Sequence, residues 1–160
     1  WGTAQLNRSL FVVLVAQFQS FCRALHDAAV DVHVGAAVEG QQVMLRTLLT
    51  QGRKLDTQNP RTSALGADFG RLGFSFIDDL KAQGAVTQLQ LVGLEQLIDY
   101  RNAIGHGDET KTVALESATN IRSTKGSYLR NRRALNSLAS TMDDVVATQL
   151  TALLGVTRPW

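Results

Sequence analysis

The sequence feature that most constrains the fold is a long apolar stripe near the start of the chain. Apolar residues recur every three or four positions here, which is the spacing of one face of an α-helix. The members of the stripe are Phe11, Leu14, Val15, Phe18, Phe21, Cys22, Leu25, Ala28, Ala29 and Val32. A helix of this length must bury its apolar face against other elements, so the stripe predicts a helical core.

Similar patterns follow along the rest of the chain. We predict further helices over residues 43–52, 65–80, 89–106 and 128–153. Two prolines and 6% aromatic residues argue against a loop-rich β-sandwich. The chain is therefore predicted to be all-α, as a four- to five-helix up-and-down bundle. Its length suits one domain, so residues 1–160 are expected to form a single helical domain.

Local signals mark the expected starts of two helices and one long connection. Ser63 follows a proline-containing turn and is a predicted N-cap. Thr87 and Gln90 have the spacing of a capping box. Residues 108–124 are polar and weakly periodic, so they are expected to form a long connection with at most one short helical turn.

The single cysteine and the three histidines indicate little chemistry by their spacing. Cys22 lies in the apolar stripe and is predicted to be a small core residue, which excludes an intrachain disulfide and favours a reducing compartment. His26, with Asp27 and Arg23, is expected in a surface cluster, and His33 is expected to be structural. The histidine spacing is not that of a metal site, so no metal or cofactor is predicted.

No membrane or targeting segment is indicated. The apolar run from Leu10 to Ala16 is much shorter than the roughly 20 residues that a membrane span needs. A cytoplasmic protein with no membrane partner is expected.

The most informative polar residue lies inside the apolar stripe of the 89–106 helix. With Leu94 at zero on a helical wheel, Ile98 falls at about 40° and Arg101 at about −20°. A guanidinium in an apolar stripe carries a large desolvation cost unless it is paired or faces a wet cavity. Asn102 lies at the edge of the stripe, and His106 follows one turn later between two glycines that indicate the end of the helix.

Spacing alone leaves two interpretations open. In the first, Arg101 is a buried structural residue paired with a carboxylate, and His106 is a helix-terminal residue stabilised by the helix dipole. In the second, Arg101 and His106 form a phosphate site with an acid–base group. A guanidinium suits bidentate contact with phosphate, and an imidazole titrates near neutral pH.

Residues 101–107, Arg-Asn-Ala-Ile-Gly-His-Gly, resemble the signature of the HEPN superfamily: an arginine, a polar residue and a histidine a few positions later. The context is similar too, because the motif ends an inner helix of a small all-α chain and a long helix follows. The resemblance covers these seven residues as a motif and most of the chain as architecture.

This resemblance implies a helical bundle that dimerises and, as in many members, a metal-independent endoribonuclease. Arg101 and His106 would be catalytic, and Asn102 would orient them. RNA supplies its own nucleophile in the 2′-hydroxyl, while His106 would act as general acid or base and Arg101 would neutralise charge on the phosphate. The expected products are a 2′,3′-cyclic phosphate and a 5′-hydroxyl. A homodimer would supply the second histidine of an acid–base pair.

The distribution of charge agrees with an RNA partner. The net charge of +2 is too small to indicate one, but residues 101–133 contain seven basic and three acidic residues, a local charge of +4. We predict RNA-backbone contacts at Lys125, Arg130, Arg132 and Arg133. The alternative is that this basic helix start is simply a solvated face.

The resemblance also extends to a biological setting. It is consistent with the toxin of a toxin–antitoxin or phage-defence system, with a cognate antitoxin protein as a partner. Two alternatives stay open: a catalytically inactive HEPN-like module that binds nucleotide, RNA or a partner protein, and a helical interaction domain in which Arg101 is structural.

Overall fold

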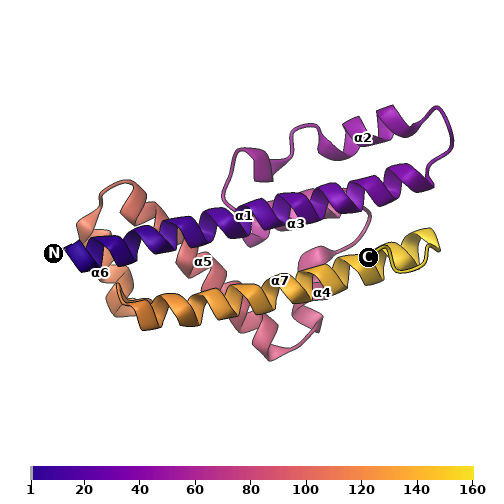
Figure 1. Cartoon of the computed structure of the whole chain (residues 1–160). Helices are drawn as coiled ribbons and strands as arrows, with labels where there is room; N and C mark the ends of the chain where they lie inside the picture. Colours follow the sequence, from indigo (N-terminus) through magenta and orange to yellow (C-terminus); the bar gives the residue numbers. More distant parts are fainter. Residues whose placement is uncertain (1) are drawn as a thin grey trace.

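The computed structural model describes residues 2–160, which form seven α-helices and one short 3₁₀ helix and contain no strand (Figure 1). The all-α prediction is therefore confirmed. The elements are α1 (Gly2–Ala36), α2 (Gln42–Thr50), η1 (Lys54–Asp56), α3 (Thr62–Gly70), α4 (Phe76–Ala82), α5 (Ala85–Gly105), α6 (Glu109–Ala118) and α7 (Lys125–Leu154).

Three long helices, α1, α5 and α7, form the frame of the bundle. Helices α1 and α7 lie side by side and run in the same direction, while α5 returns in the opposite direction and packs against both (Figure 1). Successive long helices thus alternate in direction. The shorter elements η1 and α2 lie on one side of α1, and α7 lies on the other (Figure 1).

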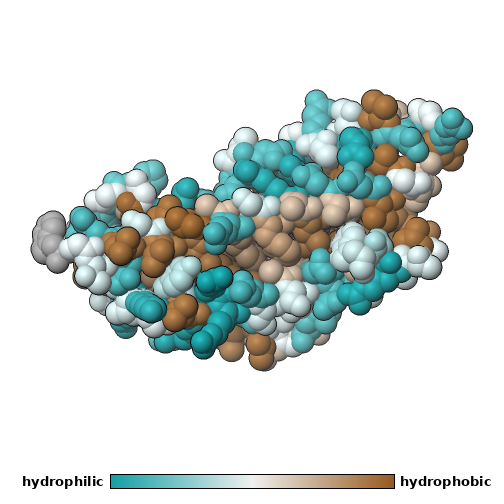
Figure 2. Space-filling model, in the orientation of Figure 1, coloured by the Kyte–Doolittle hydropathy of each residue, from teal (hydrophilic) through white to brown (hydrophobic). Residues whose placement is uncertain are grey.

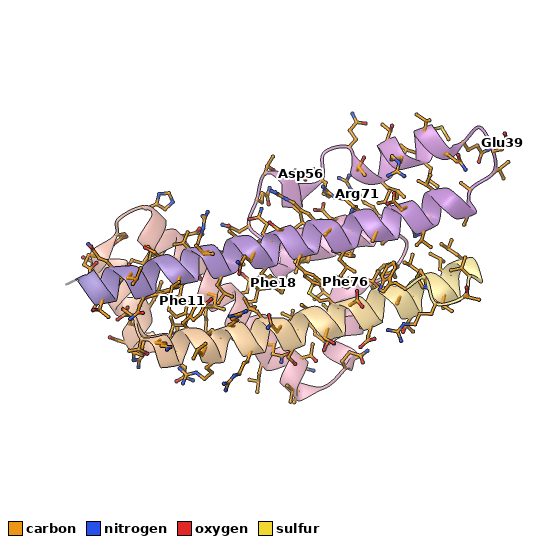
Figure 3. All side chains as sticks on the ribbon, viewed as in Figure 1. Phe11, Phe18, Glu39, Asp56, Arg71 and Phe76 are labelled. Carbon is orange, nitrogen blue, oxygen red and sulfur yellow. The ribbon has the colours of Figure 1, made fainter. Side chains whose placement is uncertain are left out.

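The apolar stripe of α1 forms the centre of one continuous core. Phe11, Phe18 and Phe76 point into the space between α1 and α7 (Figure 3). The ring of Tyr100 on α5 contacts Phe11 edge-on, with ring centroids 5.3 Å apart. Cys22 is fully buried, as predicted for a core residue.

The helix predicted over residues 65–80 is interrupted. Helix α3 ends at Gly70 and α4 begins at Phe76. Gly73 between them has a φ of +95°, a backbone conformation that L-residues rarely adopt and that breaks a right-handed helix. The apolar pattern continues across the break because the apolar residues of both short helices are buried in the same core: Leu65, Phe69, Phe76 and Leu80.

The prediction of a long connection over residues 108–124 is wrong, because this region contains α6. The Asp108 carboxylate caps the helix by accepting a hydrogen bond from the Lys111 backbone N–H at 2.9 Å. Thr112 is the one residue of α6 that is fully buried. A helix held mainly by polar contacts has little apolar periodicity, so the pattern did not reveal it.

The two predicted helix caps are also corrected. Helix α3 begins at Thr62, one residue before Ser63, and its first N–H is capped from another helix by Glu95. Helix α5 begins at Ala85 after Gly84, so Thr87 lies within the helix and is buried.

By length and composition, α1 is the one described helix that could cross a membrane, with a mean hydropathy of 1.2 over an 18-residue window. The continuous apolar run from Leu10 to Ala16 is much shorter than this window, because polar residues interrupt the apolar stripe on either side of it. The core helix of a soluble bundle passes the same criterion, and α1 packs lengthwise against α5 and α7.

The surface differs between neighbouring segments. Hydrophilic side chains gather over η1 and the connection around it, whereas apolar side chains are exposed on α2 (Figure 2). The most exposed apolar residues of α2 are Val43, Met44 and Leu48.

His26 is buried, in contrast to the expected surface cluster. Its ring Nε2 lies 3.1 Å from the backbone oxygen of Asp68, and its Nδ1 lies 3.4 Å from Nη1 of Arg53. Burial lowers the pKa of His26, and the charge of Arg53 lowers it further, against the opposing effects of Asp68 and Asp27. Burial also lowers the pKa of His33, which is partly buried.

These pKa shifts predict a loss of stability in mild acid. Because the folded protein keeps both histidines neutral below their ordinary pKa of 6.5, the unfolded chain binds protons first as the pH falls. The free energy of unfolding, measured with urea, should therefore decrease as the pH falls from about 7.5 to about 5.5. This decrease should be smaller in His26→Gln and in His33→Gln. A free energy that stays constant over this range in the parent protein would contradict the prediction.

Candidate functional site

The motif at residues 101–107 lies at the carboxyl end of α5. The helix ends at Gly105, and His106 is the C-cap residue, whose backbone N–H donates to the Asn102 backbone oxygen at 3.0 Å. Gly107, with a φ of +67°, then turns the chain toward α6. The motif is thus a helix end followed by a tight turn.

Arg101 faces a polar hollow and not the dry core. Its side chain is partly buried, and the hollow of about 480 Å³ is open to solvent. The other lining residues are Gln19, Asp56, Thr57, Gln58, Asn59 and Arg61. Among residues 2–160, Arg101 makes no salt bridge. The structure therefore lacks the carboxylate partner that a purely structural, buried Arg101 would need, and the guanidinium lines a hollow that is open to solvent.

One wall of the hollow is the chain segment 55–59, which α1 holds by hydrogen bonds. Gln19 Nε2 donates to the backbone oxygens of Leu55 at 3.1 Å and Gln58 at 2.8 Å. Arg23 Nε also donates to the Leu55 oxygen, at 2.7 Å. Asp56 lies in this wall on the side of α1 away from α7 (Figure 3). The wall therefore consists of backbone fixed by side chains of another helix.

The start of the same segment is fixed by a buried carboxylate. Asp68 of α3 is fully buried, and its two oxygens accept the backbone N–H groups of Lys54 at 2.9 Å and Leu55 at 2.7 Å. These are the first N–H groups of η1, which have no partner within the short helix. Asp68 thus caps η1 from α3.

The other edge of the segment is fixed by a polar stripe on α5. Glu95, Asp99 and Asn102 are spaced four and three residues apart, so they lie along one face of the helix. Arg61 donates to Glu95 at 2.6 Å and to Asp99 at 2.5 Å. The other oxygen of Glu95 accepts the backbone N–H and the hydroxyl of Thr62, both at 2.8 Å. Sequence reasoning missed this stripe, although the regular spacing of its polar residues was visible.

Asn102 connects the motif to this stripe and to the wall. Its Oδ1 accepts a hydrogen bond from Arg101 Nη1 and another from Asn59 Nδ2, each 3.1 Å long. The structure therefore brings together two of the three predicted catalytic residues, Arg101 and Asn102, and adds Asn59, which the sequence did not indicate.

His106 lies apart from this hydrogen-bonded group. Its side chain is exposed, has no hydrogen bond within residues 2–160 and does not line the hollow. The imidazole is available to solvent at the end of α5, while Arg101 opens into the hollow one turn earlier. Within a single chain, Arg101 and His106 therefore do not share one site.

The predicted RNA-binding residues Lys125, Arg130, Arg132 and Arg133 are all exposed on the first turns of α7. Arg130 Nη2 donates to the backbone oxygen of Asn120 at 2.6 Å. None of the four lines the Arg101 hollow, and η1 and α7 lie on opposite sides of α1 (Figure 1). The basic start of α7 is therefore a surface separate from the hollow.

A second polar cluster joins α1, α5, α6 and the start of α7. The Tyr100 hydroxyl donates to Glu116 Oε1 at 2.5 Å, and the Ser123 hydroxyl donates to the same oxygen. Arg8 binds Glu109 through two hydrogen bonds of 2.7 and 3.0 Å and lies 3.7 Å from Glu116. This cluster attaches α6 to the bundle, directly after the motif.

Burial, hydrogen bonds and a nearby charge together determine the pKa values of Tyr100 and Glu116 in this cluster. Desolvation, together with the bond to Glu116, raises the pKa of Tyr100 to about 12. Burial also opposes ionisation of Glu116, but the bonds from Ser123 and Tyr100 and the charge of Arg8 outweigh it and lower the pKa of that carboxyl. Glu116 is therefore a charged acceptor and Tyr100 a neutral donor at neutral pH.

Within the part of the chain that the structure describes, no group of three or more histidine, cysteine, aspartate or glutamate side chains could hold a metal ion. Comparison with protein-family models, with curated proteins and with solved structures gave no match. The HEPN resemblance thus rests on residues 101–107 and their place in the helical architecture.

The stripe on α5 predicts that Glu95 stabilises the wall of the hollow. Glu95→Gln should lower the free energy of unfolding, measured with urea, by about 1–2 kcal/mol, because charge-assisted bonds to Arg61 and the cap of α3 are weakened. Glu39→Gln is a matched control, since Glu39 is an exposed glutamate in the α1–α2 connection. Equal stability of the two variants would show that the Glu95 bonds contribute nothing.

Proposed function

We propose that the protein is a metal-independent endoribonuclease of HEPN type, with Arg101, Asn102 and His106 as its catalytic set. The observation that carries the proposal is the Arg101 guanidinium, which has no carboxylate partner within residues 2–160 and opens into a polar hollow. An arginine of this kind binds a phosphodiester in the bidentate manner that guanidinium geometry favours.

The cleavage reaction uses the 2′-hydroxyl of the RNA as nucleophile. His106 acts as general base or general acid, because an exposed imidazole can exchange a proton with the 2′-hydroxyl or with the leaving 5′-oxygen. Arg101 neutralises the charge that develops on the phosphate, and Asn102 fixes the direction of Arg101. The products are a 2′,3′-cyclic phosphate and a 5′-hydroxyl.

The working unit in this proposal is a homodimer. One chain supplies one motif histidine, whereas cleavage by acid–base catalysis uses a base and an acid. The exposed position of His106 supports such sharing, since its ring is accessible to a second chain. A toxin–antitoxin or phage-defence role in the cytoplasm, with a cognate antitoxin as partner, belongs to the same proposal by analogy.

The basic start of α7 is proposed to hold the RNA backbone outside the cleavage site. Lys125, Arg130, Arg132 and Arg133 are exposed and make sequence-independent phosphate contacts in this proposal. Their separation from the hollow means that they contribute to affinity and not to the chemical step.

A second candidate function is a catalytically inactive module that binds a nucleotide, an RNA or a partner protein in the hollow. The separation of His106 from the hydrogen-bonded pair of Arg101 and Asn102 favours it, because Arg101 and Asn102 can bind a phosphate without the imidazole.

Cleavage of single-stranded RNA in the presence of EDTA separates the two candidates. His106→Ala and Arg101→Ala should each lower the rate by at least about a hundredfold, because one removes proton transfer and the other removes charge stabilisation. Arg158→Ala is the control, since Arg158 is an exposed arginine paired with Asp144 at the far end of the chain. The cyclic phosphate end should be detected by mass spectrometry.

If His106→Ala cleaves as fast as the parent protein, the ribonuclease proposal fails. If the parent protein itself does not cleave RNA and Arg101→Ala weakens RNA binding, measured by fluorescence anisotropy, the binding module is supported. If Arg101→Ala changes neither binding nor cleavage, both candidates fail.

The dimer predicts a solution mass of about twice 17.4 kDa. Light scattering coupled to size exclusion measures it directly. A strict monomer that cleaves RNA would contradict the shared acid–base site, because one chain would then suffice.

A further inference from the structure

We infer that Asn59 is a positioning residue for Arg101 and acts through Asn102. The inference rests on the proposed role of Arg101 in holding the phosphate. Within residues 2–160 the one side-chain hydrogen bond of Arg101 goes to Asn102 Oδ1, at 3.1 Å. Asn59 Nδ2 donates to that same oxygen, also at 3.1 Å.

Asn59 determines which atom of the Asn102 amide faces Arg101. An asparagine amide has an acceptor oxygen and a donor nitrogen at nearly equal positions, so rotation by half a turn exchanges them. A guanidinium has only donors, and it binds the amide only through the oxygen. If Asn102 rotated, its NH₂ group would face the NH₂ group of Asn59 as well as Arg101. The donor from Asn59 therefore adds to the preference for the orientation that Arg101 needs.

Asn59 is itself held in place from both sides. Pro60, which is buried, restricts the backbone of the preceding residue. The Arg61 backbone N–H donates to the Asn59 oxygen at 2.8 Å, and the Arg61 side chain is paired with α5. On the other side, Gln19 of α1 holds the Gln58 backbone oxygen. The Asn59 amide thus belongs to a segment that α1 and α5 hold in place.

The consequence is a guanidinium in the lining of the hollow with one nitrogen held by a side chain. Nη1 has its partner on Asn102, and the other N–H groups point to no side-chain acceptor within the described residues. A substrate phosphate meets an arginine whose direction is already set, which lowers the entropy cost of binding in the transition state.

The test compares Asn59→Ala in two backgrounds. In the parent protein, Asn59→Ala should lower kcat for RNA cleavage by about fivefold to tenfold, the effect of losing one orienting hydrogen bond, with little change in KM. In an Asn102→Ala background, the same substitution should change kcat by less than about twofold, because its effect passes through Asn102. Asn7→Ala is the matched control, since Asn7 Nδ2 donates a single tertiary hydrogen bond of 3.0 Å to Ser123 away from the hollow.

The double-variant comparison separates positioning from a merely structural role. If Asn59→Ala lowers kcat equally in both backgrounds, or no more than Asn7→Ala does, the inference is overturned. A fall in apparent kcat that only follows the loss of folded protein, measured by thermal unfolding, overturns it too.

A second readout keeps the inference testable without ribonuclease activity. The rate at which phenylglyoxal modifies Arg101, followed by peptide mass mapping, should rise severalfold in Asn59→Ala and not in Asn7→Ala. An unchanged modification rate refutes the positioning role. If the parent protein does not cleave RNA but Asn59→Ala still raises the modification rate, the proposed function is refuted, while the positioning of Arg101 by Asn59 through Asn102 stands.

Discussion

The site depends on the hydrogen bonds that hold the connection between α2 and α3. This connection has little apolar surface of its own: Leu55 and Pro60 are its buried residues. Backbone groups that leave water must find partners, and here the partners are Asp68 below η1, Gln19 and Arg23 on α1, and the polar stripe of α5. Because these bonds come from three helices, the connection forms a fixed wall opposite Arg101 and not a mobile loop.

Helix α5 contributes residues both to the hydrophobic core and to the hollow. Its apolar face, with Leu94 and Ile98, is fully buried, while Glu95, Asp99 and Asn102 bind the connection along another face. Arg101 lies in line with the apolar face, near the carboxyl end of the helix, where the hollow opens. The helix can therefore present a guanidinium to solvent without breaking the core, which lowers the cost of burying the charge.

Particular elements show what the sequence could predict. The apolar stripes of α1, α5 and α7 predicted three helices because these elements bury one continuous face in the common core. Helix α6 could not be predicted in this way, since Arg8, Tyr100 and Ser123 hold it through Glu109 and Glu116. Periodicity of apolar residues does not record polar contacts between segments that are far apart in the chain.

The sequence by itself determined the all-α class, the long helices and the position of Arg101, Asn102 and His106 at a helix end, because helical spacing and glycine turns are local properties. Only the tertiary structure decided that Arg101 faces a polar hollow, that His106 stands apart from it and that Asn59 binds Asn102. The partners of α5 in the hollow lie more than 30 residues away, or on α1, and no local pattern specifies which segment will pack there. Long-range packing places the polar connection between α2 and α3 against α5, and this packing forms the hollow around Arg101.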